Sequence, residues 1–402
     1  MGKADLEKAD SEAHADRFSI VLGGPLYQLF LRGHLLKPPV GLVARRMAAA
    51  IAVTWLPLAA LSLLAGTAFG AVRVPFFLDL EVHVRLLIAL PLLLAAEPLV
   101  HTRLATVLRQ FIERGIVPPD ERRRVAGIVD DTVRLRNSIL IELLLLAAAF
   151  GLGPWLWRQV LAPGGMGSWV MAKAPLGDEA LSAAGLWYAF VSLGLFRFVL
   201  LRWYFRLALW YVFAWRLSRL PLRVNPLHPD GAGGLGFLGG TLSAMLPILL
   251  AQSVAVAGVI GTQILYQGAA LQSFYLEIGT IVALLLAMGL APLVFFVPVL
   301  LSAGLQGRLE YGELAMRYVD QFRDKWLRGA APEGERVLGS ADIQSLADLA
   351  NSHAVVERMG VLPVGVQAIT RFAIAVAVPF TPLLLSLIPL NELVGRVVKK
   401  LL

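Results

Sequence analysis

The sequence predicts an all-α polytopic membrane protein, a bundle of six or seven transmembrane helices with small cytoplasmic helical hairpins. Three observations predict it: 57% of the 402 residues are hydrophobic, only 16% are charged, and the mean hydropathy is +0.70. A soluble domain carries roughly 25% charged residues. A soluble interior also grows too slowly with chain length to hide so much apolar surface, whereas a bilayer solvates it.

The first 46 residues predict a cytoplasmic N-terminal tail followed by an interfacial segment. The tail, residues 1–16, has mixed charge and lacks the apolar core and cleavage site of a signal peptide. Residues 18–36, FSIVLGGPLYQLFLRGHLL, are too often interrupted by polar residues to span a bilayer. We therefore expect this second segment to lie along the membrane surface.

Residues 47–303 predict the transmembrane bundle. A helix needs about 20 apolar residues to cross the hydrocarbon core, and six stretches meet that length. They are 47–71, 85–101, 138–160, 184–203, 238–266 and 276–303.

Residues 368–402 predict a proline-broken membrane segment and an amphipathic C-terminal tail. The apolar part, 368–390, contains Pro379, Pro382 and Pro389. Proline removes a backbone donor and kinks helices, so this part is either a kinked seventh span or a re-entrant hairpin buried against protein. The first arrangement places the basic tail outside the cell and the second places it inside. Both stay open.

Lysine and arginine alternate between loops as the positive-inside rule requires. Seven precede residue 47, and the three loops on the same side carry eight, four and seven, whereas the loops on the other side carry one, one and none. The N-terminus and the richer loops are therefore expected in the cytoplasm. Those loops are 101–137, 204–237 and 304–367.

Two of these loops have helical periodicity. In 101–137 an amphipathic helix is expected to stop at Gly115, and a second helix to run from about Glu121 into the third span. In 304–367 one helix is expected to end at Gly329 and another to begin after Ser340, a capping residue. Aromatic residues that follow the fourth span, among them Trp203 and Trp210, suggest an interfacial belt.

Ionisable and polar residues inside the spans are the first candidate site. Glu97, His101, Glu142 and Arg197 all fall in the cytoplasmic third of the predicted membrane, and Gln252 lies in the fifth span. A lone buried charge is costly, so partners are expected, with Arg197 paired to Glu97 or Glu142. Two interpretations remain: a structural ion pair, or a permeation or proton pathway.

A glycine- and proline-rich stretch, NPLHPDGAGGLGFLGG, is the second candidate site. It precedes the fifth span and contains His228, Asp230, Gly231, Gly233 and Gly234. In one interpretation Asp230 caps the following helix. In the other, backbone amides at the helix start bind an anion, and His228 and Asp230 bind or move a proton or a metal ion, although two ligands alone do not make a metal site.

No catalytic, metal or cofactor motif accompanies these residues. The chain has no cysteine, which excludes thiolate zinc sites and cysteine nucleophiles. The glycine pattern lacks the Gly-Lys-Ser/Thr of a P-loop, and neither GxSxG nor HExxH occurs. We expect no catalytic residue, no metal and no cofactor.

Three stretches, LRVNPLHPDGAGGLGFLG, LGSADIQSLADLANS and PLLLSLIPLNEL, resemble a family of uncharacterised bacterial polytopic inner-membrane proteins. The resemblance covers most of the chain beyond about residue 85. It implies a multi-pass protein of the bacterial inner membrane and carries no activity or functional residue with it.

Three functions are compatible with the sequence. The intramembrane charges favour an oligomeric channel or transporter for ions or small solutes. The charged helical loops favour a scaffold or signalling subunit, and a lipid-modifying enzyme that uses His228 and Asp230 is the third. Expected partners are membrane lipid, a second copy of the chain and a cytoplasmic protein. Nucleic acid is not expected, because the net charge of +8 resides in loops that orient the chain.

Overall fold

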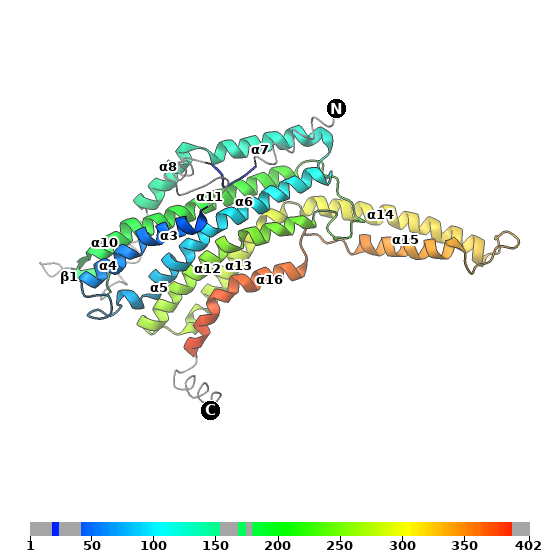
Figure 1. Cartoon of the computed structure of the whole chain (residues 1–402). Helices are drawn as coiled ribbons and strands as arrows, with labels where there is room; N and C mark the ends of the chain where they lie inside the picture. The colour runs from blue at the N-terminus through cyan, green and yellow to red at the C-terminus, as the bar shows by residue number, and fades with distance from the viewer. Residues whose placement is uncertain (1–17, 24–41, 153–167, 174–178, 388–402) are drawn as a thin grey trace.

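The computed structural model describes residues 18–23, 42–152, 168–173 and 179–387. Nearly all of this chain is helical (Figure 1), which confirms the all-α bundle. Six of the helical segments are long and apolar enough to cross a membrane, which shows a multi-pass membrane protein. They are Val43–Leu64, Leu80–Glu113, Ala183–Ser218, Gly236–Gln267, Leu271–Val294 and Val366–Ser386.

The first half of the chain consists of α3 (Val43–Thr54), α4 (Leu56–Leu64), η1 (Phe76–Leu78), α5 (Leu80–His83), η2 (Val84–Ala89), α6 (Leu90–Glu113), η3 (Pro119–Glu121), α7 (Arg122–Arg136), α8 (Ile139–Ala147), η4 (Ala148–Leu152) and a small antiparallel sheet of β1 (Met171–Lys173) and β2 (Glu179–Leu181).

The second half consists of α10 (Ala183–Trp187), η6 (Tyr188–Ser192), α11 (Leu193–Ser218), η7 (Gly236–Gly239), α12 (Gly240–Gln267), η8 (Leu271–Phe274), α13 (Tyr275–Val294), α14 (Val297–Phe322), η9 (Arg323–Leu327), α15 (Ala341–Glu357), α16 (Val366–Ala377) and η10 (Val378–Leu387).

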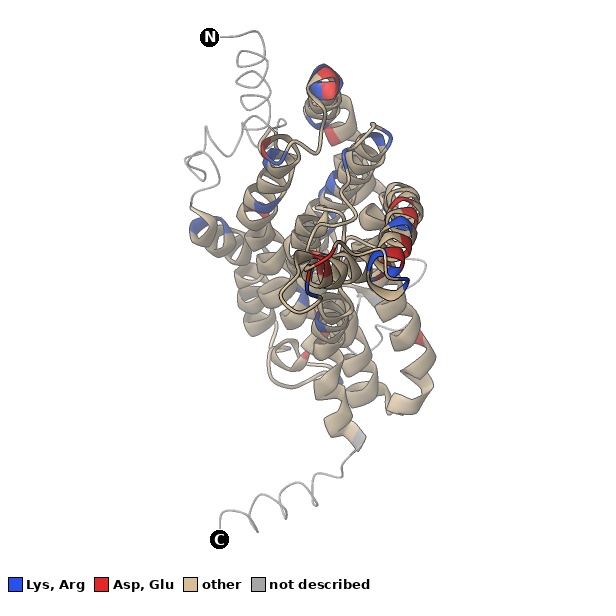
Figure 2. Cartoon of the chain, turned by 90° about the vertical axis from the view of Figure 1, so that its right-hand side faces the viewer, with Lys and Arg blue, Asp and Glu red and all other residues tan. Residues whose placement is uncertain are grey.

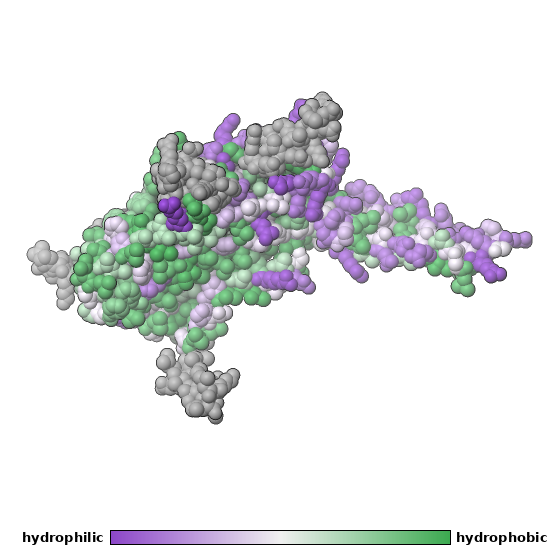
Figure 3. All heavy atoms as spheres, viewed as in Figure 1, coloured by the Kyte–Doolittle hydropathy of each residue, from purple (hydrophilic) through white to green (hydrophobic). Residues whose placement is uncertain are grey.

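The bundle has two chemically different ends. At one end, here the basic end, α6 and α11 finish, α3 and α12 begin, and the charged residues gather (Figures 2 and 3). At the opposite end lies the small sheet, where Val74 bridges Ser168. The middle of the molecule is apolar on its surface (Figure 3), as a membrane-facing belt requires.

The chain also passes from the basic end to the opposite end between Ile139 and Ser168. Helix α8 begins this passage, and its described apolar part, Ile139–Gly151, is shorter than the other six. The remainder of the expected span, residues 153–160, lies outside the described residues.

The last apolar segment crosses the bundle and does not turn back. Its start lies at the basic end, where Val364 is next to Gly239, and its end lies at the opposite end, where Leu383 is next to Gly261. The α-helix ends at Ala377, and a 3₁₀ stretch follows that accommodates Pro379 and Pro382. Of the two arrangements left open by the sequence, the structure has the crossing one; the tail beyond residue 387 lies outside the described residues.

The helix that contains the expected span 184–203 continues without a break from Ala183 to Ser218. Its expected aromatic belt is in part a protein core: Trp203 and Trp210 are both 1% exposed. The Trp203 indole donates to the Leu93 carbonyl oxygen over 2.9 Å. The prediction of a lipid-facing belt is therefore wrong for these two residues, because neighbouring helices extend equally far and cover them.

Residues 101–137 form a helix, a turn and a helix, as expected. Helix α6 continues without a break to Glu113, and Gly115 ends it with a positive φ of 65°. Helix α7 then runs back along the bundle. It does not continue into the next helix, because the helix is interrupted at Asn137 and Ser138, and Ser138 caps α8.

A helical hairpin projects from the basic end, and we call residues 297–357 the arm. Helices α14 and α15 lie side by side and extend away from the bundle (Figure 1). The turn between them contains Gly329, and Ser340 precedes α15, as the sequence indicates. At the tip, Asp342 accepts hydrogen bonds from Lys325 and from the Trp326 indole, both over 2.9 Å.

Candidate functional site

Glu97 lies in a buried charge cluster at the basic end. Its carboxylate accepts hydrogen bonds from Arg46 of α3 and from Arg206 of α11, the latter over 2.9 Å. A third guanidinium, that of Arg202, lies 3.9 Å away. The Glu97 residue is only 6% exposed. Three cations thus surround one buried carboxylate, which offsets the cost of removing it from water.

The geometry of α11 places two of these arginines together. Arg202 and Arg206 are four residues apart, so they lie on one face of the helix. The Arg206 guanidinium also stacks on the Trp203 ring at 4.8 Å. Helix α3 adds Arg46, whose side chain is 3% exposed. The cluster therefore joins three helices that are distant in sequence.

Residues 18–23 complete the cluster. This segment was expected on the membrane surface, yet Phe18, Ile20 and Val21 are at most 1% exposed. Arg206 donates to the Val21 carbonyl oxygen over 3.2 Å, and Ser19 contacts the His101 ring over 3.1 Å. The segment lies inside the protein because its carbonyl oxygens accept hydrogen bonds from buried arginines.

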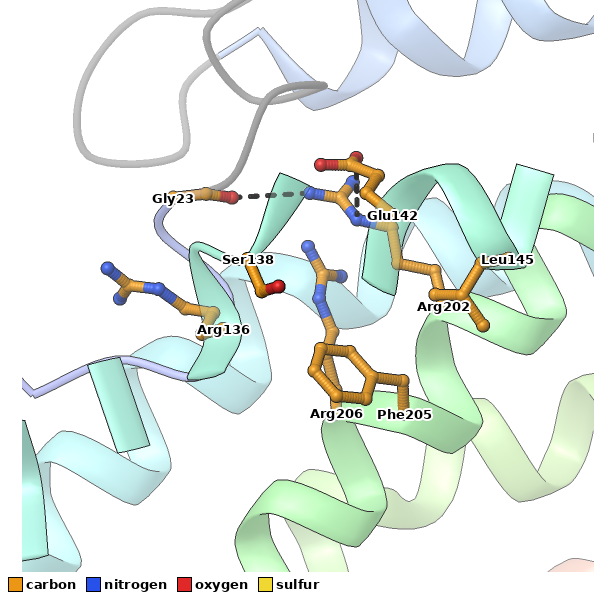
Figure 4. Close-up of a pocket in the computed structure, with 8 residues that line it drawn as sticks. All are labelled: Gly23, Arg136, Ser138, Glu142, Leu145, Arg202, Phe205 and Arg206. Carbon is orange, nitrogen blue, oxygen red and sulfur yellow. Dashed lines mark hydrogen bonds and ion pairs between the residues drawn. The ribbon is translucent and has the colours of Figure 1, made fainter. Parts of the chain in front are cut away.

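A small pocket lies beside the cluster, between α8, α11 and residues 18–23 (Figure 4). Glu142 of α8 lines it and lies 3.8 Å from the Arg202 guanidinium. Ser138, at the start of α8, and Arg136, at the end of α7, are also in its wall. Glu97, His101 and Glu142 are thus brought to one region, as their positions in the sequence suggested.

The other two intramembrane candidates lie apart from this cluster. Glu97 pairs with Arg46 and Arg206, not with Arg197 as expected. In the described part of the chain, Nη1 of Arg197 is buried without a hydrogen-bond partner. Gln252 of α12 accepts a hydrogen bond from the Tyr204 hydroxyl. The Tyr204–Gln252 contact joins α11 to α12.

The loop before α12 is organised by Asp230. Its carboxylate accepts hydrogen bonds from three backbone amides, those of Ala232, Gly234 and Gly236, over 2.8, 3.1 and 2.9 Å. His228 lies 2.9 Å from the same carboxylate. Although partial burial opposes it, these donors hold the pKa of Asp230 below its usual range. The three amides that were candidates to bind an anion are therefore already bonded to Asp230.

The glycines of this loop serve its backbone. Gly231, Gly233 and Gly234 have φ values of 63°, 62° and 94°, a region that L side chains rarely adopt. The Gly231 carbonyl oxygen accepts a hydrogen bond from Gly360, just beyond the arm, over 2.7 Å. The loop thus connects the start of α12 to the base of the arm.

Sequence reasoning missed the residues that complete the cluster, namely Arg46, Arg202, Arg206 and Ser19. The available signal was the arginine pair at i and i+4 in a helix otherwise rich in aromatics, a composition that is equally typical of the membrane interface. A buried carboxylate at the opposite end, Asp79, was also missed; it accepts a hydrogen bond from the Trp169 indole over 2.9 Å.

Over residues 18–23, 42–152, 168–173 and 179–387, no three or more acidic and histidine side chains gather in a way that could hold a metal ion. Comparisons of the chain with protein-family models, with curated proteins and with solved structures find no match. The proposals below therefore rest on the geometry of this molecule.

Proposed function

We propose that this chain is a self-associating membrane scaffold: the bundle anchors it, and the arms of neighbouring copies pair on the cytoplasmic side. The basic end is assigned to the cytoplasm by the positive-inside rule. The observation that supports pairing is the exposure of large apolar residues on the arm. Leu305, Leu309 and Met316 are 57%, 76% and 70% exposed.

These residues form a continuous seam. Leu305, Leu309, Gly312, Met316 and Val319 are separated by four, three, four and three residues, the spacing of a coiled-coil interface. The seam is distinct from the face that packs on α15. Helix α15 covers the side that includes Tyr318, whose hydroxyl donates to the Asp342 carbonyl oxygen. At 3.6 residues per turn, Tyr318 lies about 140° around the helix from the middle of the seam.

A second copy of the chain fits this seam. Both arms of a pair in one membrane project the same way, so their α14 helices run parallel. In a parallel pair, the residue before one core position faces a residue five places further along the partner helix. That register places Arg308 opposite Glu313 of the partner subunit, and by symmetry forms two such pairs. Within the described chain Arg308 has no ion-pair partner, whereas Glu313 is exposed and lies 3.0 Å from Arg317 of the same helix, a surface pair that it can exchange.

The seam covers only two heptads, which is short for an isolated coiled coil. Anchoring in the membrane compensates for this short length, because it raises the effective concentration at which the arm of one chain meets the arm of another. Pairing therefore depends on the bundle as well as on the arm, and this is why anchor and arm belong to one function.

The alternatives have less support from contacts. A channel or transporter would need Glu97, His101 or Glu142 to line a path, yet Glu97 is enclosed by three guanidiniums. A lipid-modifying enzyme would need His228 and Asp230 free to act, yet Asp230 is bonded to three amides. Ion flux through liposomes containing the purified protein, lost on neutralising Arg197, would favour the channel instead.

Single-cysteine crosslinking tests the scaffold directly, because the chain has no cysteine of its own. In membranes oxidised with copper phenanthroline, Met316→Cys and Leu309→Cys should each form a disulfide-linked dimer, since like core residues of a parallel pair face each other. Glu310→Cys, on the polar face, is the matched control and should stay monomeric. Equal crosslinking of all three would indicate random collision, and no crosslinking would contradict self-association.

Charge exchange provides a second test. Arg308→Glu and Glu313→Arg should each reduce dimer formation by the Met316→Cys chain, because each places like charges across the seam. The double exchange should restore it. These side chains face solvent or lie at the edge of the arm, so the substitutions leave the bundle intact. Failure of the double variant to recover would rule out the parallel register.

A further inference from the structure

The pocket beside Glu97 has an excess of positive charge. Three arginines, Arg46, Arg202 and Arg206, lie in or next to it, while the described carboxylates there are those of Glu97 and Glu142. Excess charge in a site screened from water is costly unless an anion offsets it.

Arg202 is the cation whose contacts are weakest. Its side chain is only 11% exposed, yet the guanidinium lies 3.8 Å from Glu142 and 3.9 Å from Glu97. The hydrogen bond that it donates to the Gly23 carbonyl oxygen is 3.4 Å long. Charge-assisted bonds are typically about 2.7–2.9 Å. Figure 4 shows that Arg202 and Arg206 approach each other from neighbouring turns of α11, with Ser138 close by.

The start of α8 adds donors to the same space. The Ser138 oxygen accepts from the Ile141 amide, so its hydroxyl proton is available to a ligand. The helix dipole at this end favours negative charge. Beyond Ser138, the outer face of α8 is strongly apolar: Leu140, Leu143 and Leu144 are 67%, 57% and 59% exposed.

We propose that this pocket binds the phosphate group of an anionic membrane phospholipid. Arg202 and Arg206 would donate to its oxygens, as guanidinium groups do in bidentate phosphate recognition. The acyl chains would lie against the leucines of α8, since that apolar face begins where the pocket ends. The oxyanion is the recognised chemistry, and the apolar face is the reason to assign it to a lipid headgroup instead of free phosphate.

Thermal unfolding of delipidated protein in neutral detergent tests the proposal. One titration adds phosphatidylglycerol in micelles, and the other adds inorganic phosphate. Phosphatidylglycerol should raise the Tm of the natural chain, because a ligand that binds only the folded state stabilises it. In Arg202→Gln, which removes a charged hydrogen-bond donor, the phosphatidylglycerol concentration needed for the same rise should be about tenfold higher.

Two further variants keep the test decisive. Ser138→Asp retains a capping residue and adds a negative charge to the pocket, so it should weaken the response even if Arg202→Gln fails to fold. Arg216→Gln, on the same helix but paired with exposed Asp131 outside the pocket, should respond as the natural chain does.

The two titrations separate the sources of the anion. A response to phosphatidylglycerol alone supports the lipid site. An equal response to inorganic phosphate would overturn the lipid assignment, though not the anion site. If neither raises the Tm, or if all variants respond alike, there is no anion site here. None of these results depends on whether the arms pair.

Discussion

The two ends of the bundle each bury a carboxylate, and they do so in opposite ways. At the basic end, Glu97 contacts two guanidiniums, and a third lies 3.9 Å away. At the opposite end, Asp79 is 9% exposed and is held by a neutral donor, the Trp169 indole. The first carboxylate is compensated by opposite charge and the second mainly by hydrogen bonds.

This difference is visible in the protonation of Asp79. Burial raises its pKa to about 6, even though the Trp169 hydrogen bond acts in the opposite direction. An indole donor is neutral, so it cannot offset the desolvation of a carboxylate as a guanidinium can. One end of the bundle is therefore built around charge, whereas the other is built around a carboxyl group that gains a proton in mildly acid solution.

Removing the charge of Glu97 should have the largest effect. Glu97→Gln preserves the side-chain shape but leaves the surrounding guanidiniums without their carboxylate, and breaking a buried ion pair costs about 3–5 kcal/mol. Denaturant unfolding of the purified protein in detergent measures the loss. Glu310→Gln, an exposed change on the arm, should cost little. A loss at Glu97 no larger than at Glu310 would mean that the arginines are compensated elsewhere.

Asp79→Asn should stabilise the protein, and only above mildly acid pH. The folded state keeps the Asp79 proton up to about pH 6, whereas an unfolded aspartate loses it near pH 4. Stability therefore falls as pH rises between these values, and the substitution should recover about 2–3 kcal/mol at pH 8. Asparagine keeps an oxygen to accept from Trp169. Unfolding at pH 4 and pH 8 tests this, and an equal effect at both pH values would contradict it.

Removing Asp230 should have the smallest effect of the three. Its carboxylate is intermediate between the other two, because backbone amides hold it in a partly exposed loop. Asp230→Ala removes the acceptor of three amides in a partly exposed loop, so a loss of about 1–2 kcal/mol is expected. Because the pKa of Asp230 is lowered, its contribution should be constant from pH 7 to 5 and be lost only as the pH falls below the usual aspartate range. Hydrogen exchange of the Ala232, Gly234 and Gly236 amides in Asp230→Ala measures the loss of these bonds. If their protection equals that in the natural chain, the amides are not bonded to Asp230.

The fold was largely predictable because it follows from local properties. Apolar length located five of the six long helices, Gly115 and Gly329 marked helix ends, and Ser340 marked the start of α15. The course of residues 368–390 was not predictable, since a proline-rich apolar segment is compatible with crossing or turning back. Its packing between Gly239 and Gly261 decided the matter.

The candidate site was predictable in its members but not in its connections. Glu97 and Glu142 stand out in any apolar helix, and Asp230 stands out in its glycine-rich loop. Their partners do not, because Arg46, Arg202 and Arg206 occur where arginine is ordinary, near the ends of spans. Distances between helices are set by packing, and packing cannot be read from the spacing of residues along one helix.

By itself, then, the sequence determined that the chain resides in a membrane, because the free energy of transferring 20-residue apolar segments into lipid depends on composition alone. It also determined which segments are helical, because hydrogen bonds within each helix satisfy the backbone without help from neighbours. Only the tertiary structure decided which charges meet, which amides Asp230 occupies and which face of the arm is left uncovered. Each of these depends on how separate helices pack together, and short-range contacts of that kind arise only in the assembled bundle.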